Sequence, residues 1–296
     1  MASSDHTPPE NLPSEVFLDT SIHLARLRSP AFQRRIDETL EHFARKGTSS
    51  YAKVEYGNNV LSVAAYLLDK LEKLGDLEAL ADHINNRLVP EYRDHRKKQL
   101  WFFNLLRKHF NRPEATERAK LELRRLLRIG TDRVSSLCDE TRDGIACPHA
   151  DQRGCRRWRR PQYCQDAHPR CRISEFFTEN RALFCRIRDA ILNEPVDART
   201  AELDRFAGII DQACKKPEIL RDVQYCLGLA DAIISVDSQN YRSFFTENIK
   251  ESRVLCRTLS QLLLYLKQDP MEAVEYLEFR ASSPLPEDHG SSCEQA

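Results

Sequence analysis

The stretch that decides the fold is EVFLDTS, at residues 15–21. Its first part, Glu15–Leu18, is a short and largely apolar run that Asp19 ends with a polar side chain. A bounded run of this length predicts a buried strand. The segments that follow, IHLARL and AFQRRIDETLEHFARKG, have apolar residues at helical spacing, and we expect Gly47 to cap the second helix. A strand followed by helices indicates an α/β fold.

Helical spacing continues along most of the chain. SYAKVEYGNNVLSVAAYLLDKLEKL predicts a helix from about Tyr51 to Leu74, and similar patterns precede and follow a cysteine-rich stretch in the middle. The segment ILRDVQYCLG also has a helical pattern. Near the C-terminus, LADAIISVD (229–237) and SRVLC (252–256) predict two further strands, and LSQLLLYL (259–266) predicts a closing helix.

The composition is typical of a folded, water-soluble protein. Of the 296 residues, 41% are hydrophobic and 30% are charged, and the mean hydropathy is −0.57. No apolar stretch approaches the ~20 residues of a membrane span. The first residues, MASSDHTPPENLP, lack the basic-then-apolar order of a secretory signal. We therefore expect an intracellular protein without membrane association, and the sequence does not distinguish cytoplasm from nucleus.

The formal net charge of zero conceals a segregation of charge. Residues 87–172 hold 22 Lys and Arg against 11 Asp and Glu, which is +11, and the rest of the chain holds 23 against 34, which is −11. A basic middle third attracts polyanions. The alternative is a set of solvated helix faces, which are often rich in arginine.

Three motifs resemble, in order, those of the PIN-domain nucleases. They are VFLDTSIHL (16–24), SYAKVEYGNNVL (50–61) and RDVQYCLGLADAIISVDSQNYRSFF (221–245). That family has a strand-end Asp followed by Ser or Thr, a Glu on an early helix, a helical Asp, and a second strand-end Asp followed by an aromatic residue. The resemblance covers 14–68 and 204–268. It implies a PIN-like three-layer α/β fold with a central, mostly parallel sheet.

The resemblance implies a set of acids that bind a metal and act in catalysis. Its third member stays open, because Asp231 and Asp211 lie near Asp222 and the spacing from Asp222 to Asp237 is about one helical turn shorter than in the family. The ordinary alternatives are an Asp that caps a helix and a Glu in a first helical turn. The implied acids are Asp19, Glu55, Asp222 and Asp237, with supporting contacts from Thr20, Ser235 and Asn240.

Converging carboxylates are the ligands that Mg²⁺ or Mn²⁺ prefers, and such an ion activates water near neutral pH. The resemblance implies an endoribonuclease that acts on RNA rather than DNA and leaves a 5′-phosphate and a 3′-hydroxyl. The alternative is a non-catalytic nucleic-acid-binding or scaffold protein that keeps the PIN fold. A third hypothesis is a nuclease toxin controlled by a protein inhibitor or partner.

The domain organisation that follows is discontinuous. We predict a PIN-like domain from 14–68 and 201–268, interrupted by a mainly helical, basic and cysteine-rich insertion over 69–200. The polar ends, 1–13 and 281–296, are expected to be disordered tails.

The insertion carries a cluster of thiols and imidazoles in a stretch without periodicity. Such a cluster is what a structural Zn²⁺ site requires. There is no CxxC pair, so a zinc ribbon or RING is not indicated. Disulfides and unliganded cysteines are the alternatives. One tetrahedral ion would take only a subset of the candidates, which are Cys138, Cys147, Cys155, Cys164, His168 and Cys171.

Arginines and aromatic residues alternate in RGCRRWRRPQYC (153–164). Arginine forms fork-like hydrogen bonds with phosphate, and aromatic rings stack on unpaired bases. The pattern predicts contact with single-stranded nucleic acid, and the alternative is that the Trp158 ring anchors the loop on neighbouring helices. The predicted binding residues are Arg153, Arg156, Arg157, Trp158, Arg159 and Arg160.

Overall fold

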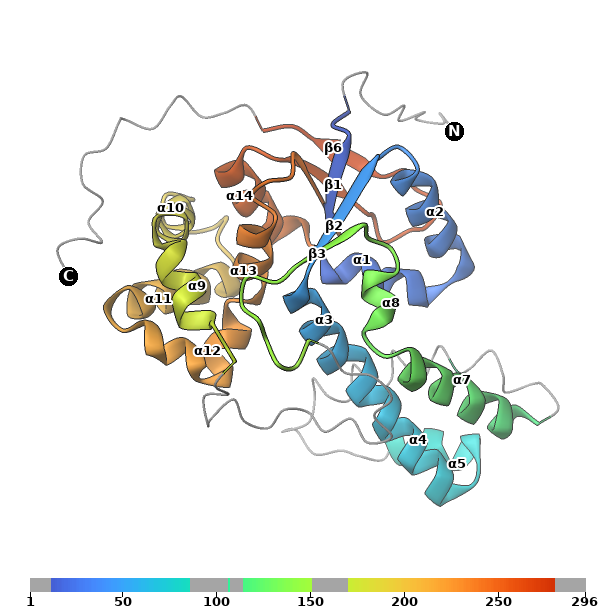
Figure 1. Cartoon of the computed structure of the whole chain (residues 1–296). Helices are drawn as coiled ribbons and strands as arrows, with labels where there is room; N and C mark the ends of the chain where they lie inside the picture. Colours follow the sequence, from blue (N-terminus) through green and yellow to red (C-terminus); the bar gives the residue numbers. More distant parts are fainter. Residues whose placement is uncertain (1–11, 86–105, 107–113, 151–169, 280–296) are drawn as a thin grey trace.

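The computed structural model describes residues 12–85, 106, 114–150 and 170–279. In these ranges the chain folds around one six-stranded sheet with helices on both faces (Figure 1), which confirms the predicted α/β class. No helix in these ranges is long and apolar enough to cross a membrane.

The sheet has the strand order β3-β2-β1-β4-β5-β6. All neighbouring strands are parallel except β5 and β6, which are antiparallel. The chain adds β2 and β3 on one side of the central strand β1, and then adds β4 and β5 on the other side. The carboxyl ends of β1 and β4 therefore meet at a topological switch point, where α/β proteins build their sites. The strands are β1 (Glu15–Leu18), β2 (Arg45–Ser49), β3 (Glu140–Arg142), β4 (Ser243–Thr246), β5 (Leu262–Tyr265) and β6 (Glu275–Leu277).

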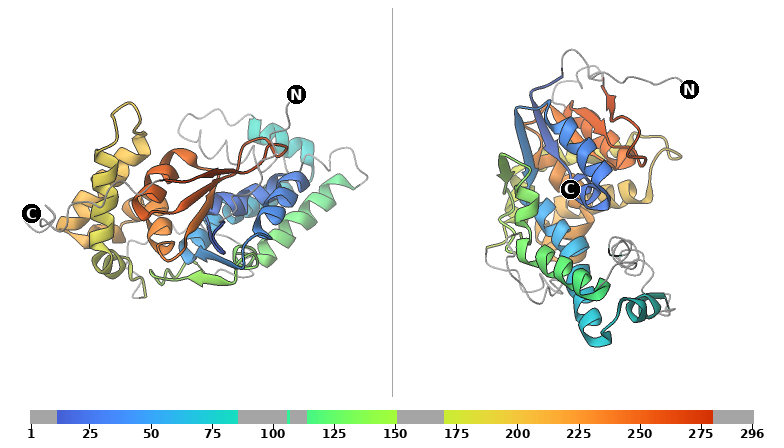
Figure 2. Two further views of the ribbon diagram at one scale, coloured as in Figure 1. Left: turned by 90° about the horizontal axis from the view of Figure 1, so that it is seen from above. Right: turned by 90° about the vertical axis from the view of Figure 1, so that its right-hand side faces the viewer.

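Helices α9 to α12 lie at one end of the molecule and α4, α5 and α7 at the other (Figures 1 and 2). The helix expected from Tyr51 to Leu74 is confirmed as α3, a π-helical turn (Gly57–Leu61) and α4 in succession. A 3-10 helix (Pro217–Arg221) precedes α12. The helices are α1 (Thr20–Arg28), α2 (Pro30–Leu40), α3 (Ser50–Tyr56), α4 (Ser62–Leu74), α5 (Leu77–Asn85), α7 (Ala115–Ile129), α8 (Asp132–Ser135), α9 (Ile173–Glu179), α10 (Arg181–Leu192), α11 (Ala201–Lys215), α12 (Val223–Gly228), α13 (Ala230–Asp237) and α14 (Ile249–Leu259).

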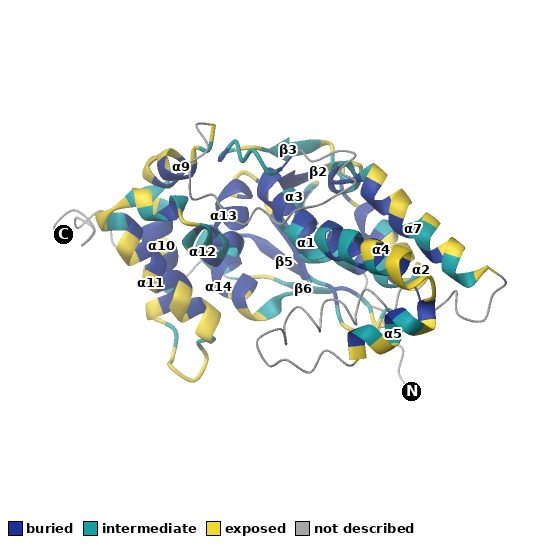
Figure 3. Ribbon diagram, turned by 90° about the horizontal axis from the view of Figure 1, so that it is seen from below, coloured by how far each residue is buried: buried dark blue, intermediate teal, exposed yellow. Residues whose placement is uncertain are grey.

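The apolar core lies on both faces of the sheet. Alternate residues of β1 face opposite ways: Val16 and Leu18 belong to the core cluster that includes α1 and α2 residues, and Phe17 belongs to the cluster that includes α3, α13 and α14 residues. The inner strands β1, β4 and β5 are accordingly largely buried, as Figure 3 shows for β5, whereas the edge strands β3 and β6 are only partly buried. The strand predicted at Glu15–Leu18 is confirmed with these bounds.

Gly47 does not cap a helix, so that prediction is wrong. Helix α2 ends at Leu40, and Gly47 lies in the middle of β2. The side chain of Tyr241 occupies the space that a Cβ at this position would need. A glycine inside a strand often marks such a close approach, and here it admits an aromatic ring against the backbone.

Three predictions near the C-terminus are also wrong. LADAIISVD contains helix α13, SRVLC lies within helix α14, and LSQLLLYL contains strand β5. In α13 the residues from Ala232 to Asp237 are all buried, so the helix has no polar face by which periodicity could distinguish it from a buried strand. The strand that precedes α14 is SFFT, at 243–246.

The predicted insertion is joined to the sheet. Strand β3 lies within 69–200 and pairs with β2, and β6 lies beyond residue 268. One apolar cluster includes α4, α7, α10, α11 and α13 residues, so residues on both sides of the boundary at 200 share a core. Residues 1–11 and 280–296 lie outside the described ranges.

Candidate metal centre

Asp19 lies at the carboxyl end of β1 and caps helix α1. One carboxylate oxygen accepts a hydrogen bond from the backbone N–H of Thr20 at 2.7 Å, and the other lies 3.4 Å from the N–H of Ser21. The sequence produces this geometry because Asp both ends the strand and satisfies the first N–H groups of the next helix. Asp19 is 7% exposed, so its charge is held in a largely desolvated place.

Glu55 lies on α3, the helix that follows β2. Its carboxylate accepts a hydrogen bond of 2.6 Å from the hydroxyl of Thr20. The Ser49 hydroxyl accepts from the N–H of Tyr51 at 3.0 Å and so caps α3. Helices α1 and α3, which follow β1 and β2, are therefore linked through Thr20 and Glu55. Thr20 was predicted to support the acids, and it contacts one of them.

Asp231, in the first turn of α13, completes a group with Asp19 and Glu55. One carboxylate oxygen from each of the three lies within 4.8 Å of the others. Three oxygen ligands at this separation could share one hard divalent cation, such as Mg²⁺ or Mn²⁺. The sequence left the third acid open between Asp222, Asp231 and Asp211, and the structure brings Asp231 to the group.

The three carboxylates repel one another in a desolvated place. Burial raises the pKa of Asp231 well above its ordinary range, and the charges of Glu55, Asp19 and Glu251 raise it further. Asp231 therefore cannot readily carry its negative charge unless a proton or a cation compensates the group. The donor set fits a bound divalent cation, because every ligand is a carboxylate and the site has surplus negative charge.

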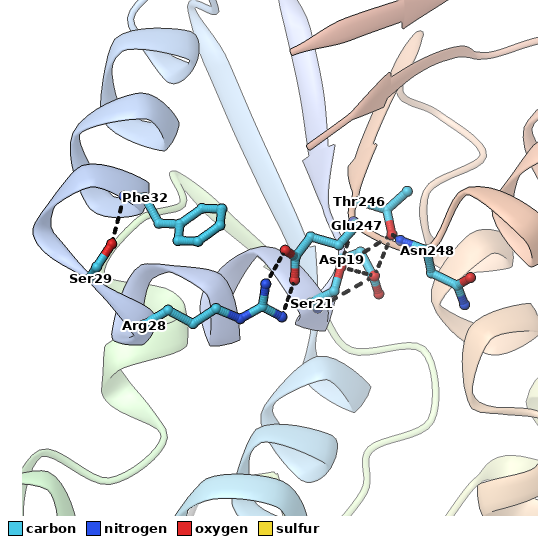
Figure 4. A network of polar contacts seen from close by, with 8 residues as sticks. All are labelled: Asp19, Ser21, Arg28, Ser29, Phe32, Thr246, Glu247 and Asn248. Atoms are coloured by element: carbon cyan, nitrogen blue, oxygen red, sulfur yellow. Dashed lines mark hydrogen bonds and ion pairs between the residues drawn. The ribbon is translucent and has the colours of Figure 1, made fainter. Parts of the chain in front are cut away.

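The loop between β4 and α14 contributes polar contacts to this centre (Figure 4). The Thr246 hydroxyl donates to Asp19 at 2.7 Å, and the Ser21 hydroxyl donates to the same oxygen at 2.5 Å. The Asn248 amide lies 3.4 Å from an Asp231 oxygen, within reach to donate to it. Neither Thr246 nor Asn248 was predicted from the sequence as a site residue. The pattern that could have indicated them is the short run SFFT followed by two polar residues, which is similar to EVFL followed by DTS.

Glu251 is a fourth acid near the centre, and it too was not predicted from the sequence. It lies in the first turn of α14, is 9% exposed, and accepts a hydrogen bond of 2.8 Å from the Thr200 hydroxyl. Its charge acts on Asp231 from outside the group of three. The strand predicted at SRVLC left Glu251 outside any element, whereas the helix that forms there begins at Ile249 and includes it.

An ion pair fixes the β4–α14 loop to the end of α1 (Figure 4). Arg28 donates two hydrogen bonds to the Glu247 carboxylate, at 2.5 and 2.7 Å, and the Glu247 side chain is only 5% exposed. The N–H of Glu247 donates to the Ser21 hydroxyl at 2.9 Å. The pair thereby holds Thr246 beside Asp19, so Arg28 and Glu247 act on the centre by positioning its neighbours.

Other predicted site residues lie elsewhere. Asp222 is exposed and caps helix α12, with a carboxylate oxygen accepting from the N–H of Gln224 at 2.8 Å. Asn240 is exposed in a turn, and Ser235 is buried inside α13. The structure therefore gives Asp222 an ordinary capping role, and it does not bring Asp222 or Asn240 to the acids of the centre.

Asp237 lies at the far end of α13 from Asp231. A separation of six positions along the helix corresponds to a rise of about 9 Å along its axis. Asp237 is 8% exposed and accepts a hydrogen bond from the Ser49 hydroxyl. Burial raises its pKa to about 7; the Ser49 hydrogen bond opposes this shift, and the charge of Asp143 adds to it. Asp237 is a buried acid beside the end of β2 and does not join the metal centre.

The zinc candidates fall in different parts of the fold. Cys138 packs against the core cluster on the α1–α2 face, whereas Cys147 and Cys171 pack against the cluster on the other face. Burial also raises the pKa of the Cys138 thiol to about 12, which favours the protonated form. Cys138 is therefore separated from the other two. Cys155, Cys164 and His168 lie outside the described residues, as does the predicted RNA-binding run from Arg153 to Arg160.

Within the ranges that the structure describes, the acids are the one group of three or more His, Cys, Asp or Glu residues placed to share a metal ion. No protein-family model, no curated protein and no solved structure matches the chain. Asp19, Glu55 and Asp231, with the polar residues that hold them, are therefore the features of the described chain that bear on its function.

Proposed function

We propose that the chain is a metal-dependent nuclease of the PIN type that cleaves single-stranded RNA. The observation that carries the proposal is the meeting of Asp19, Glu55 and Asp231 within 4.8 Å at the switch point of the sheet. These acids come in the order strand-end Asp, helical Glu and helical Asp, as in the family that the motifs resemble. The mostly parallel sheet with helices on both faces is compatible with a PIN-like three-layer fold.

Asp19, Glu55 and Asp231 would hold Mg²⁺ or Mn²⁺. A cation at this place lowers the pKa of water and offsets charge on a phosphodiester. Each acid is oriented by a neighbour: Asp19 by Thr246 and Ser21, Glu55 by Thr20, and Asp231 by Asn248. Such preorganised ligands keep their geometry without further ordering when a cation binds, which favours tight and specific coordination.

The non-catalytic alternative would be favoured by the lack of a third acid. Asp231 supplies that acid, so the geometry favours hydrolysis over a purely scaffolding role. RNA is the proposed substrate because the resembled family favours it and because residues 87–172 carry a net charge of +11, from 22 basic and 11 acidic residues.

We expect the purified chain to cleave a fluorescein-labelled single-stranded RNA when Mg²⁺ or Mn²⁺ is present. EDTA should stop cleavage, and an excess of either ion should restore it, because carboxylates alone do not generate a strong nucleophile from water near neutral pH. Product ends, analysed by gel and mass spectrometry, should be 5′-phosphate and 3′-hydroxyl. Undiminished cleavage in EDTA would refute the metal requirement, and RNA binding without cleavage in either ion would favour the scaffold.

A further inference from the structure

Helix α7 has one face in the core and one face rich in arginine. Ala119, Leu123, Leu126 and Leu127 are buried in the larger apolar cluster. The opposite side of the helix is exposed, as the yellow segments of α7 show in Figure 3. The exposed basic residues of this helix are Arg118, Arg124, Arg125 and Arg128.

Three of these arginines have no acidic partner in the described ranges. Arg124 forms an ion pair of 2.7 Å with Glu72 on α4, and Lys120 uses the acid Glu117 on its own helix, also at 2.7 Å. The guanidinium groups of the remaining Arg118, Arg125 and Arg128 form no hydrogen bond or ion pair with the described part of the chain. In the described part of the chain, no acid therefore holds these three guanidinium groups.

The three arginines lie on one side of the helix. Arg118 and Arg125 are two turns apart, and Arg128 follows almost one turn later, so all three project from neighbouring positions on the surface. Together they span a rise of about 15 Å. Leu121, which lies between them, is 68% exposed. The three arginines thus form a cationic stripe with an apolar side chain in its middle. The opposite face of α7 packs in the core and holds the helix in place.

The stripe leads towards the metal centre. Helix α7 passes through Gly130 into α8, and α8 packs against α3, the helix of Glu55 (Figures 1 and 2).

We propose that Arg118, Arg125 and Arg128 bind the phosphate backbone of single-stranded RNA and lead the strand along α7 towards the acids. Guanidinium groups bind phosphate in a fork geometry. A row of three can neutralise several successive phosphates of one strand, so it suits a polyanion better than a single small anion. The exposed Leu121 offers an apolar contact to an unstacked base. This inference rests on the proposed function, because the path has a purpose only if the acids act on RNA.

The test is a binding titration with labelled oligouridylate in EDTA, which separates binding from cleavage. The variant is Arg118→Gln/Arg125→Gln/Arg128→Gln, and the matched control is Arg34→Gln/Lys215→Gln/Lys216→Gln, which removes the same charge from α2 and the end of α11. Because the variant can no longer neutralise three phosphates, its log–log salt slope should flatten by about two units, and its affinity at low salt should fall roughly tenfold or more. The control should bind like wild type.

Arg125→Gln alone should flatten the slope by about 0.7, which keeps the test valid if the triple variant folds poorly. Equal losses in the triple variant and its control would overturn the proposal in favour of general electrostatics. Wild-type affinity and slope in the triple variant, or no RNA binding by the wild type, would also overturn it and direct attention to an acidic protein partner. Because the titration measures binding in EDTA, its outcome does not depend on whether the nuclease assay succeeds.

Discussion

We expect Asp231→Asn to lower the rate of RNA cleavage by at least about 10³-fold and Asp222→Asn to leave it unchanged. Removing one of the three proposed charged ligands would weaken binding of the cation that activates water, and that contribution is worth several kcal/mol of transition-state stabilisation. Because burial and like charges already raise the pKa of Asp231, the neutral amide should not destabilise the fold. Cleavage rates in saturating Mg²⁺ and thermal melts of both variants measure the two effects separately.

Asp222→Asn is a close control for this substitution. Asp222 is exposed and caps α12 through the N–H of Gln224, and Asn caps helices about as well as Asp. A loss of cleavage in Asp222→Asn together with an active Asp231→Asn would contradict the arrangement of acids described above. Activity in both variants would remove the catalytic role of this group.

We expect Asp237→Asn to raise the free energy of unfolding at about pH 8 by an amount on the order of 4 kcal/mol, and by little at about pH 4. The folded chain holds the Asp237 proton up to a pKa of about 7, far above the ordinary value of an Asp side chain. The stability contributed by this group is therefore fully present below its unfolded-state pKa and is lost as pH rises through about 7. The amide removes the titration and still accepts the Ser49 hydrogen bond.

Urea unfolding of wild type and Asp237→Asn across this pH range gives the difference directly. The groups that face Asp237 are Ser49, Asp143 and Arg142, and only Asp237 changes between the two proteins. A pH-independent difference for Asp237→Asn would show that the carboxyl is not held neutral. Cleavage by Asp237→Asn should stay near wild type, because the residue does not belong to the metal centre.

Local signals were sufficient to predict β1, Asp19 and the helix of Glu55. Asp19 follows the last residue of the strand and also caps the next helix. The apolar run and the capping residue therefore give consistent evidence within a few positions of the sequence. Thr20 was expected to support the acids, and its hydroxyl reaches Glu55. That contact joins residues 35 positions apart, and only the packing of α1 against α3 brings them together.

The third acid and the β4–α14 loop could not be predicted as securely. Helix α13 is buried on every side after Asp231, so its sequence has the continuous apolar character of an inner strand. Once this segment was interpreted as a strand, Asp237 became the apparent strand end, and the true one after SFFT was overlooked. Thr246 and Asn248 are linked to Asp19 and Asp231 by the parallel pairing of β4 with β1, which no local pattern shows.

The most direct test of the metal centre is Mn²⁺ binding, followed by electron paramagnetic resonance and by calorimetry. The wild-type chain should bind about one Mn²⁺ through the acid group, and Asp19→Asn/Asp231→Asn should lose that binding because two of its three carboxylates are gone. Asp222→Asn/Asp237→Asn, which replaces two carboxyl groups outside the centre, should bind Mn²⁺ like wild type. Equal Mn²⁺ affinity in the wild type and in Asp19→Asn/Asp231→Asn would contradict the metal centre.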